Sequence, residues 1–167
     1  VSPGCWPDCD MLPLGRLRLN KRKFEEVSDW TQLTETEQVT MMSLWCIFRS
    51  PLMISSEMRD NDEFTLQLLT NREILEMHRF GEGAHQVYRT EETCAWRSVD
   101  TRDGGTYVAL FNLSDQQREV SACWEELGLS GPHAARDLWA HQDAGVLEGR
   151  VAAVLPPHGS AVYKLEK

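Results

Sequence analysis

The sequence predicts a mixed chain, in which the end of an α/β repeat is followed by an antiparallel β-sandwich. The first part rests on a capped apolar helix, which is followed by a short apolar run and a second helix. The second part rests on short alternating runs after residue 80, separated by turn signals such as Asp103-Gly104-Gly105. We therefore expect two units, residues 1–80 and residues 81–167.

Residues 1–33 are expected to form an extended loop, because prolines and glycines interrupt the segment too often for a helix or a central strand. Its most informative part runs from Trp6 to Met11 and contains two carboxylates, Asp8 and Asp10. Shaped loops on rigid scaffolds are where binding and catalytic groups concentrate. The local sequence alone favours a simpler role for both carboxylates, in which they bond their own backbone in Asx-type turns.

Thr34 and Glu37 have the spacing of a capping box, which predicts a helix from Gln38 to about Arg49. This helix is apolar on nearly every side, so we expect it to be buried on more than one face. Residues 51–54 form a short apolar run of the kind found in buried parallel strands. A second helical region is predicted from residue 64 to about residue 79.

Beyond Phe80 the pattern changes to short strands. Seven are predicted, over residues 86–89, 93–99, 106–113, 119–124, 135–139, 150–155 and 160–165. Trp96, Trp124 and Trp139 could together form a face on which a sugar stacks, but in a sandwich such residues belong more often to the core.

A single α/β repeat leaves a physical problem, because it cannot bury an all-round apolar helix or pair both edges of its one parallel strand. Either further repeats belong to the same protein or a neighbouring molecule covers these surfaces. We expect the first, so the chain is expected to be a portion of a longer protein.

Composition excludes some functions. The formal net charge of −9 argues against a nucleic-acid partner, and no apolar run approaches the roughly 20 residues that span a bilayer. The five cysteines lack the spacing of a zinc site, so we expect buried free thiols, no metal and no cofactor. A glycosylation sequon at Asn112 has meaning only in a eukaryotic secretory protein. The compartment stays open between bacterial cytoplasm and periplasm or secretion.

Four motifs together resemble the melibiase-type α-galactosidases of glycoside hydrolase family 27. They are GCWPDCDML at residues 4–12, TETEQ at 34–38, SLWCIFRSPLM at 43–53 and LLTN at 68–71. The resemblance is close over residues 3–80 and continues more loosely through RDLW at 136–139 and PPHG at 156–159.

The resemblance implies the last part of a (β/α)8 barrel that begins just after its seventh strand, with residues 51–54 as the eighth strand, followed by a C-terminal β-sandwich. It implies a retaining glycoside hydrolase that cleaves terminal α-linked galactose. Such an enzyme needs two carboxyl groups about 5–5.5 Å apart. In the family both aspartates lie on earlier strands, so no catalytic residue is expected in this chain. Its partners would be a galactoside and the N-terminal barrel portion. The alternative is a non-catalytic carbohydrate-binding or interaction module.

The family match places Asp10 and Met11 at the mouth of the barrel. We therefore expect Asp10, Met11 and Trp6 to form a substrate-binding surface, with Asp8 shaping the loop. Two positions depart from the family pattern, the pair Met77-His78 after the second helix and Cys5 in the loop. For His78, an interaction with the helix C-terminal dipole is favoured over a role as a catalytic base.

Overall fold

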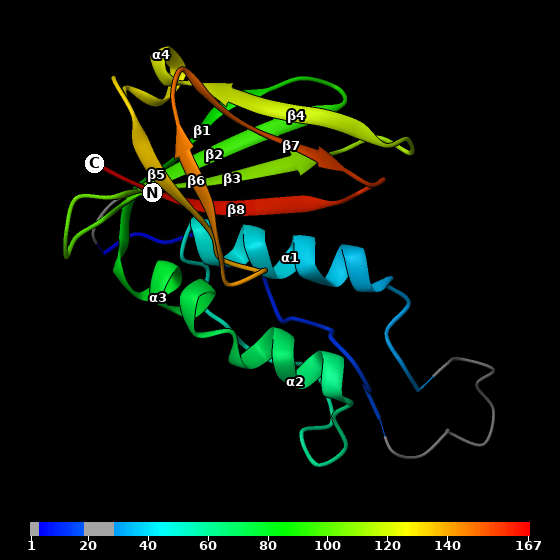
Figure 1. The fold of residues 1–167 in the computed structure, drawn as a ribbon. Helices are drawn as coiled ribbons and strands as arrows, with labels where there is room; N and C mark the ends of the chain where they lie inside the picture. Colours follow the sequence, from blue (N-terminus) through cyan, green and yellow to red (C-terminus); the bar gives the residue numbers. More distant parts are fainter. Residues whose placement is uncertain (1–3, 19–28) are drawn as a thin grey trace.

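A computed structural model describes residues 4–18 and 29–167 (Figure 1). Three helices come first: α1 (Glu35–Ile47), α2 (Glu63–Thr70) and α3 (Arg72–Phe80). Eight strands and one short helix, α4 (Trp124–Leu127), follow. The strands are β1 (Gly81–Arg89), β2 (Thr93–Asp100), β3 (Thr106–Asn112), β4 (Arg118–Cys123), β5 (His133–Asp137), β6 (Gln142–Leu147), β7 (Arg150–Leu155) and β8 (Ser160–Glu166).

The strands form two antiparallel sheets of unequal size. Six strands are arranged in the order β1-β2-β3-β8-β5-β6, and β4 pairs with β7 in the smaller sheet. Figure 1 shows the small sheet on one side of the large sheet and α1 on the other. The predicted antiparallel β-sandwich is confirmed, and one of its outer faces is covered by a helix from the first half of the chain.

The central strand β3 shows why the large sheet is covered on both faces. All seven of its residues are buried. Tyr107 and Phe111 pack in a cluster with Met42 of α1, while Val108 and Leu110 pack in a second cluster with the small sheet. Successive side chains of a strand point to opposite faces, so one strand contributes to both cores. The helical half and the sandwich therefore share the first core.

The capping box that begins α1 is confirmed. The hydroxyl of Thr34 accepts a hydrogen bond from the backbone N–H of Glu37 at 3.2 Å, and the Glu37 carboxylate accepts one from the Thr34 N–H at 2.8 Å. The helix begins at Glu35, three residues earlier than predicted, and ends at Ile47. In the described part of the chain, no helix is both long and apolar enough to cross a membrane.

The predicted second helix is wrong as a single element, because it breaks at Asn71. This residue has φ −61° and ψ 106°, so it ends α2 and caps α3. Its side-chain oxygen accepts from the N–H of Ile74 at 3.1 Å, and its amide donates to the carbonyl of Leu138 at 3.0 Å. The Asn71 side chain thus satisfies a free N–H group at the start of α3 and joins this helix end to the sandwich.

The predicted strand at residues 51–54 is also wrong as an element, since it is reduced to one parallel bridge between Ile54 and Leu12. The Leu12 N–H donates to the carbonyl of Met53 at 2.7 Å, and the Ser55 N–H donates to the carbonyl of Leu12 at 2.9 Å. A longer parallel strand needs neighbours that extend the ladder. The opening segment was expected to be only a loop, yet Leu12 lies where a parallel neighbour of residues 51–54 belongs.

Two elements of the second half were not predicted. Strand β6 is exposed at nearly every position and contains Gly145, so it lacks the apolar alternation that reveals a strand. Helix α4 has only four residues and ends at Gly128, whose φ of 66° suits glycine. Strand β1 begins at Gly81 rather than Gln86, and irregular pairing with β2 masks its alternation.

Candidate sugar-binding loop

Two local hydrogen bonds shape the loop from Trp6 to Met11. The backbone N–H of Asp10 donates to the carboxylate of Asp8 at 3.0 Å, and the N–H of Met11 donates to the carboxylate of Asp10 at 2.7 Å. Asp10 has a φ of 69°, in the left-handed region that aspartate tolerates better than most residues because its short side chain bonds locally. The Asx-type turn expected at Asp8 is therefore present.

The C-terminal part of α1 holds the loop from behind. The indole N–H of Trp45 donates to the carbonyl of Asp10 at 3.1 Å, and the backbone N–H of Cys9 donates to the hydroxyl of Ser50 at 3.1 Å. These contacts join segments about forty residues apart in the sequence. They fix the backbone of the loop and leave the side chains of Asp8 and Asp10 exposed.

The loop presents a mixed surface to solvent. Trp6 is 41% exposed and Met11 is 46% exposed, whereas Leu12 just beyond them is fully buried. Met53, whose carbonyl bonds the Leu12 backbone, is 58% exposed. Carboxylates that accept hydrogen bonds from hydroxyl groups, next to apolar side chains that cover C–H groups, are suited to a sugar.

His78 lies behind this loop. Its ring Nε2 is 2.8 Å from the carbonyl oxygen of Ser50, the residue whose hydroxyl anchors Cys9. Burial lowers the pKa of His78, and the nearby charge of Arg49 acts in the same direction. A neutral ring that donates to a backbone carbonyl supports the loop anchor, and this contact gives His78 a packing role.

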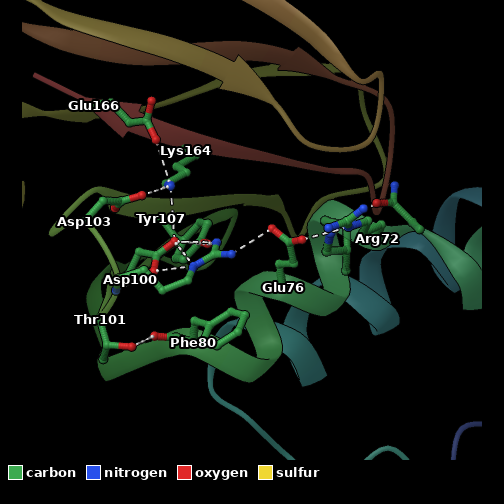
Figure 2. Close-up of polar contacts among 12 residues, drawn as sticks. Arg72, Glu76, Phe80, Asp100, Thr101, Asp103, Tyr107, Lys164 and Glu166 are labelled. Carbon is green, nitrogen blue, oxygen red and sulfur yellow. Dashed lines mark hydrogen bonds and ion pairs between the residues drawn. The ribbon is translucent and has the colours of Figure 1, made fainter.

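A second polar cluster joins α3 to the sandwich (Figure 2). The carboxylate of Asp100 is fully buried and is contacted by Arg102 at 2.8 Å and Lys164 at 3.1 Å. Burial acts to raise the pKa of Asp100, but hydrogen bonds from Arg102 and Tyr107 outweigh it, so the pKa falls well below its usual range. Arg102 also reaches Glu76 of α3 at 3.0 Å.

A hollow of about 580 Å³ lies beside this cluster, lined in part by Glu73, Arg136 and Lys164. Arg136 contacts Glu73 at 2.8 Å, and Lys164 contacts Glu166 at 2.7 Å. These lining charges are paired with one another. The ion pair of Arg136 with Glu73 joins α3 to the large sheet beside the hollow. Sequence reasoning identified residues 103–105 only as a turn and missed the pairing of Asp100 with Arg102.

Residues 92–165 match the family model described as the alpha galactosidase C-terminal beta sandwich domain. The crystal structure of a family 27 β-L-arabinopyranosidase from Geobacillus stearothermophilus is 47% identical, with a TM-score of 0.91. It covers 98% of this chain, which spans 38% of that protein. The chain is similar to the C-terminal portion of melibiase-type glycoside hydrolases of family 27.

Two α-galactosidases are also similar to this chain. "Alpha-galactosidase 2" of Arabidopsis thaliana is 26% identical over 171 residues, which cover 100% of this chain and 39% of that protein. The structure of α-galactosidase I from Mortierella vinacea shares the fold, with a TM-score of 0.80 at 19% identity. It covers 96% of this chain, and the chain spans 39% of it. The chain thus spans about two fifths of the length of these relatives.

Within this chain, the three tryptophans of the sandwich serve packing. Trp124 is buried and its indole N–H donates to the carbonyl of Gly131 at 2.8 Å. The indole N–H of Trp139 donates to the hydroxyl of Ser43 on α1 at 2.8 Å. The ring of Trp96 lies 5.5 Å from that of Phe48. These contacts assign the indoles to the cores, as the sequence favoured.

The cysteines and the sequon of this chain lie in different environments. Cys46 and Cys94 are buried free thiols, and burial raises the pKa of both. Cys5 is exposed and Cys9 and Cys123 are only partly buried, so the expectation of burial was wrong for these three. Among the described residues, no group of three or more His, Cys, Asp or Glu side chains is arranged to hold a metal ion. Asn112 is buried, and its amide donates to the carbonyls of Gln116 and Pro156 at 2.7 and 2.8 Å.

Proposed function

We propose that this chain closes the catalytic barrel of a retaining glycoside hydrolase and supplies one wall of its sugar pocket from Trp6, Asp10 and Met11. The observation that carries the proposal is the conformation of Asp10. Its backbone is held in the left-handed region by Trp45 and by the turn at Asp8, while its side chain is exposed next to Met11. Strained backbone that the surrounding structure enforces is typical of binding and catalytic sites.

The rest of the barrel is the partner in this proposal. The parallel bridge between Leu12 and Ile54 supports an eighth barrel strand at residues 51–54 beside the loop that follows the seventh strand, and this strand needs further parallel partners to complete a closed sheet. The exposed side chain of Met53 is consistent with a surface that such strands and their loops cover. Residues 1–80 then form the end of the barrel, and residues 81–167 form the sandwich.

The nucleophile and the acid/base group lie outside this chain in the proposal. A retaining enzyme needs a carboxylate that attacks the anomeric carbon and a second carboxyl group that protonates the leaving oxygen. Asp10 binds its own backbone and the sugar hydroxyls, so it positions the substrate without taking part in bond breaking. The 167-residue chain by itself is therefore expected to be inactive.

Terminal α-linked galactose is the proposed substrate class. The second candidate is a β-L-arabinopyranoside, because the Geobacillus relative is 47% identical, whereas the Arabidopsis α-galactosidase is 26% identical. The two sugars share the ring configuration and differ in the hydroxymethyl group that arabinopyranose lacks. A non-catalytic carbohydrate-binding module is less favoured, since Trp96, Trp124 and Trp139 make core contacts.

The test compares nitrophenyl α-galactoside with nitrophenyl β-L-arabinopyranoside, using this chain alone and joined to the rest of the barrel. We expect no turnover by the chain alone and measurable turnover by the joined polypeptide. Asp10→Asn is expected to lower kcat/KM about 10- to 100-fold, the effect of losing a hydrogen bond to a charged group. Asp8→Asn is the matched control, because its side-chain oxygen still accepts from the Asp10 N–H.

Hydrolysis above the buffer rate by the chain alone would overturn the proposal that the nucleophile and the acid/base group lie outside this chain. Equal, small effects of Asp10→Asn and Asp8→Asn would remove Asp10 from the pocket. The ratio of the two nitrophenyl rates decides between the two sugars.

A further inference from the structure

Arg49 has an unusual backbone at the point where α1 ends. Its φ is 61°, and it is one of four residues other than glycine with positive φ in the described part of the chain. A second one, Asp10, lies in the loop that α1 supports through Trp45. Such a conformation is costly for a long side chain and persists only where other contacts enforce it.

The side chain of Arg49 spans from the loop to the sandwich. Its guanidinium carbon lies 4.9 Å from the centre of the Trp6 ring. On the other side, Nη1 donates to the carbonyl of Gly81 at 3.4 Å and lies 3.6 Å from the carboxylate of Glu82, both at the start of β1. The Arg49 side chain is 22% exposed and Trp6 is 41% exposed, so their contact is partly shielded from water.

The neighbouring residue makes a parallel connection. Ser50 is fully buried, and its hydroxyl accepts from the Cys9 N–H in the loop while its carbonyl contacts His78 of α3. Arg49 and Ser50 therefore hold two points of the same loop: Arg49 contacts the Trp6 side chain, and Ser50 bonds the Cys9 backbone. Arg49 connects the loop to β1, and Ser50 connects it to α3.

We propose that Arg49 is a positioning residue for the loop from Trp6 to Met11, coupling the loop to the first strand of the sandwich. Its guanidinium covers a face of Trp6 that an exposed loop would leave free, and Glu82 and Gly81 fix the guanidinium. The sandwich then helps to set where Asp10 and Met11 lie. The consequence for sugar binding rests on the proposed function, but the coupling itself does not.

Three substitutions of Arg49 separate the effect of its side-chain contact from the effect of its backbone strain. Arg49→Ala removes the contact with Trp6 and keeps the strained backbone. Arg49→Gly also removes the contact but relieves the strain, because glycine adopts positive φ readily. Arg49→Lys keeps a cation that can lie over the indole and loses the planar fork. Arg79→Ala is the matched control, since the Arg79 guanidinium lies 5.0 Å from the Phe80 ring, on an exposed residue of α3.

The first readout is amide hydrogen exchange of the 167-residue chain, compared between the loop and the strands of the large sheet. Arg49→Ala and Arg49→Gly are both expected to speed exchange at Cys9 and Met11 about two- to fivefold, the range for losing one cation–π contact. Exchange in β2 and β3 is expected to be unchanged. Arg49→Lys is expected to lie between these variants and the unaltered chain, and Arg79→Ala to match the unaltered chain.

Loop exchange in Arg49→Gly equal to that of the unaltered chain would overturn the proposal, because the side chain would then contribute nothing. Faster exchange throughout the sheet in Arg49→Ala and Arg49→Gly would overturn it as well, since the residue would only stabilise the fold. The second readout uses the polypeptide with the complete barrel, where Arg49→Ala is expected to raise KM at least twofold and leave kcat nearly unchanged. An unchanged KM with faster loop exchange would contradict the proposed sugar contact and leave the coupling standing.

Discussion

The phenol of Tyr107 donates a hydrogen bond to the fully buried carboxylate of Asp100 at 2.6 Å. Tyr107 lies on β3 in the core shared by the sheet and α1, whereas Asp100 ends β2 and is paired with Arg102. This bond therefore links an apolar core to an ionic cluster, in which a buried charge is tolerated because it is fully paired.

Tyr107→Phe is expected to destabilise the chain by about 1.5–3 kcal/mol, the loss of a hydrogen bond to a charged group. Urea unfolding measures the change. Tyr163→Phe is the control, because among the described residues its hydroxyl makes no hydrogen bond to another protein group. Equal unfolding midpoints for the two variants would show that the Asp100 bond adds nothing to stability.

The same cluster predicts a dependence of stability on pH. The pKa of Asp100 is lower in the folded chain than its ordinary value of about 3.9, so its contribution is present above about pH 4 and is lost as the pH falls. Hydrogen bonds from Arg136 and Arg72 lower the pKa of Glu73 and Glu76, with the same sign. Asp100→Asn is expected to flatten the dependence of the urea midpoint on pH between about 2 and 5, without abolishing it. An unchanged slope would contradict this account.

The sequon at Asn112 is expected to stay unmodified in a eukaryotic secretory host. The amide nitrogen that would carry a glycan is buried and donates to the carbonyls of Gln116 and Pro156. Intact mass measures modification directly. Asn112→Ala is expected to cost about 1–3 kcal/mol, because buried carbonyls lose their donor. A glycan mass on the folded chain would contradict this prediction, because Asn112 would then be modified before it is buried.

Asp10→Gly is expected to separate stability from binding. Glycine relieves the φ of 69°, so the free energy of unfolding is expected to be unchanged or to rise by up to about 1 kcal/mol. Sugar binding by the polypeptide with the complete barrel is expected to fall, because the carboxylate is gone. Thermal unfolding and sugar titration of the same variant provide the two measurements. A clear loss of stability would mean that the Asp10 carboxylate stabilises the loop by more free energy than the strained backbone of Asp10 costs.

Local signals predicted the elements that local chemistry controls. The capping box of Thr34 and Glu37 predicted the N-terminus of α1 to within three residues, and the apolar run at residues 106–113 predicted β3. The break at Asn71 was missed because its conformation depends on Leu138, 67 residues away. Strand β6 was missed because an exposed edge strand has no apolar face to reveal it.

The role of Trp6, Asp10 and Met11 in a site stays a prediction from their motif. The supports of the loop were not predicted, because the anchors Trp45 and Ser50 lie in a motif that was assigned to helix and strand. Arg49 gave no signal, since nothing in a sequence indicates a positive φ for arginine. The pairing of Asp100 with Arg102 and Lys164 depends on three separate strand ends and turns, which only the folded topology brings together.

The shared core has a consequence for how such sandwiches are inherited. Tyr107, Phe111 and Val162 face α1, so excision at residue 80 would leave a wide apolar sheet face in water and invite aggregation. The family match begins at residue 92, within a sheet whose first strand begins at Gly81. Recombination that moves this sandwich between proteins must therefore carry β1 and a helix like α1 with it. The segment that is exchanged must therefore include more than the two sheets.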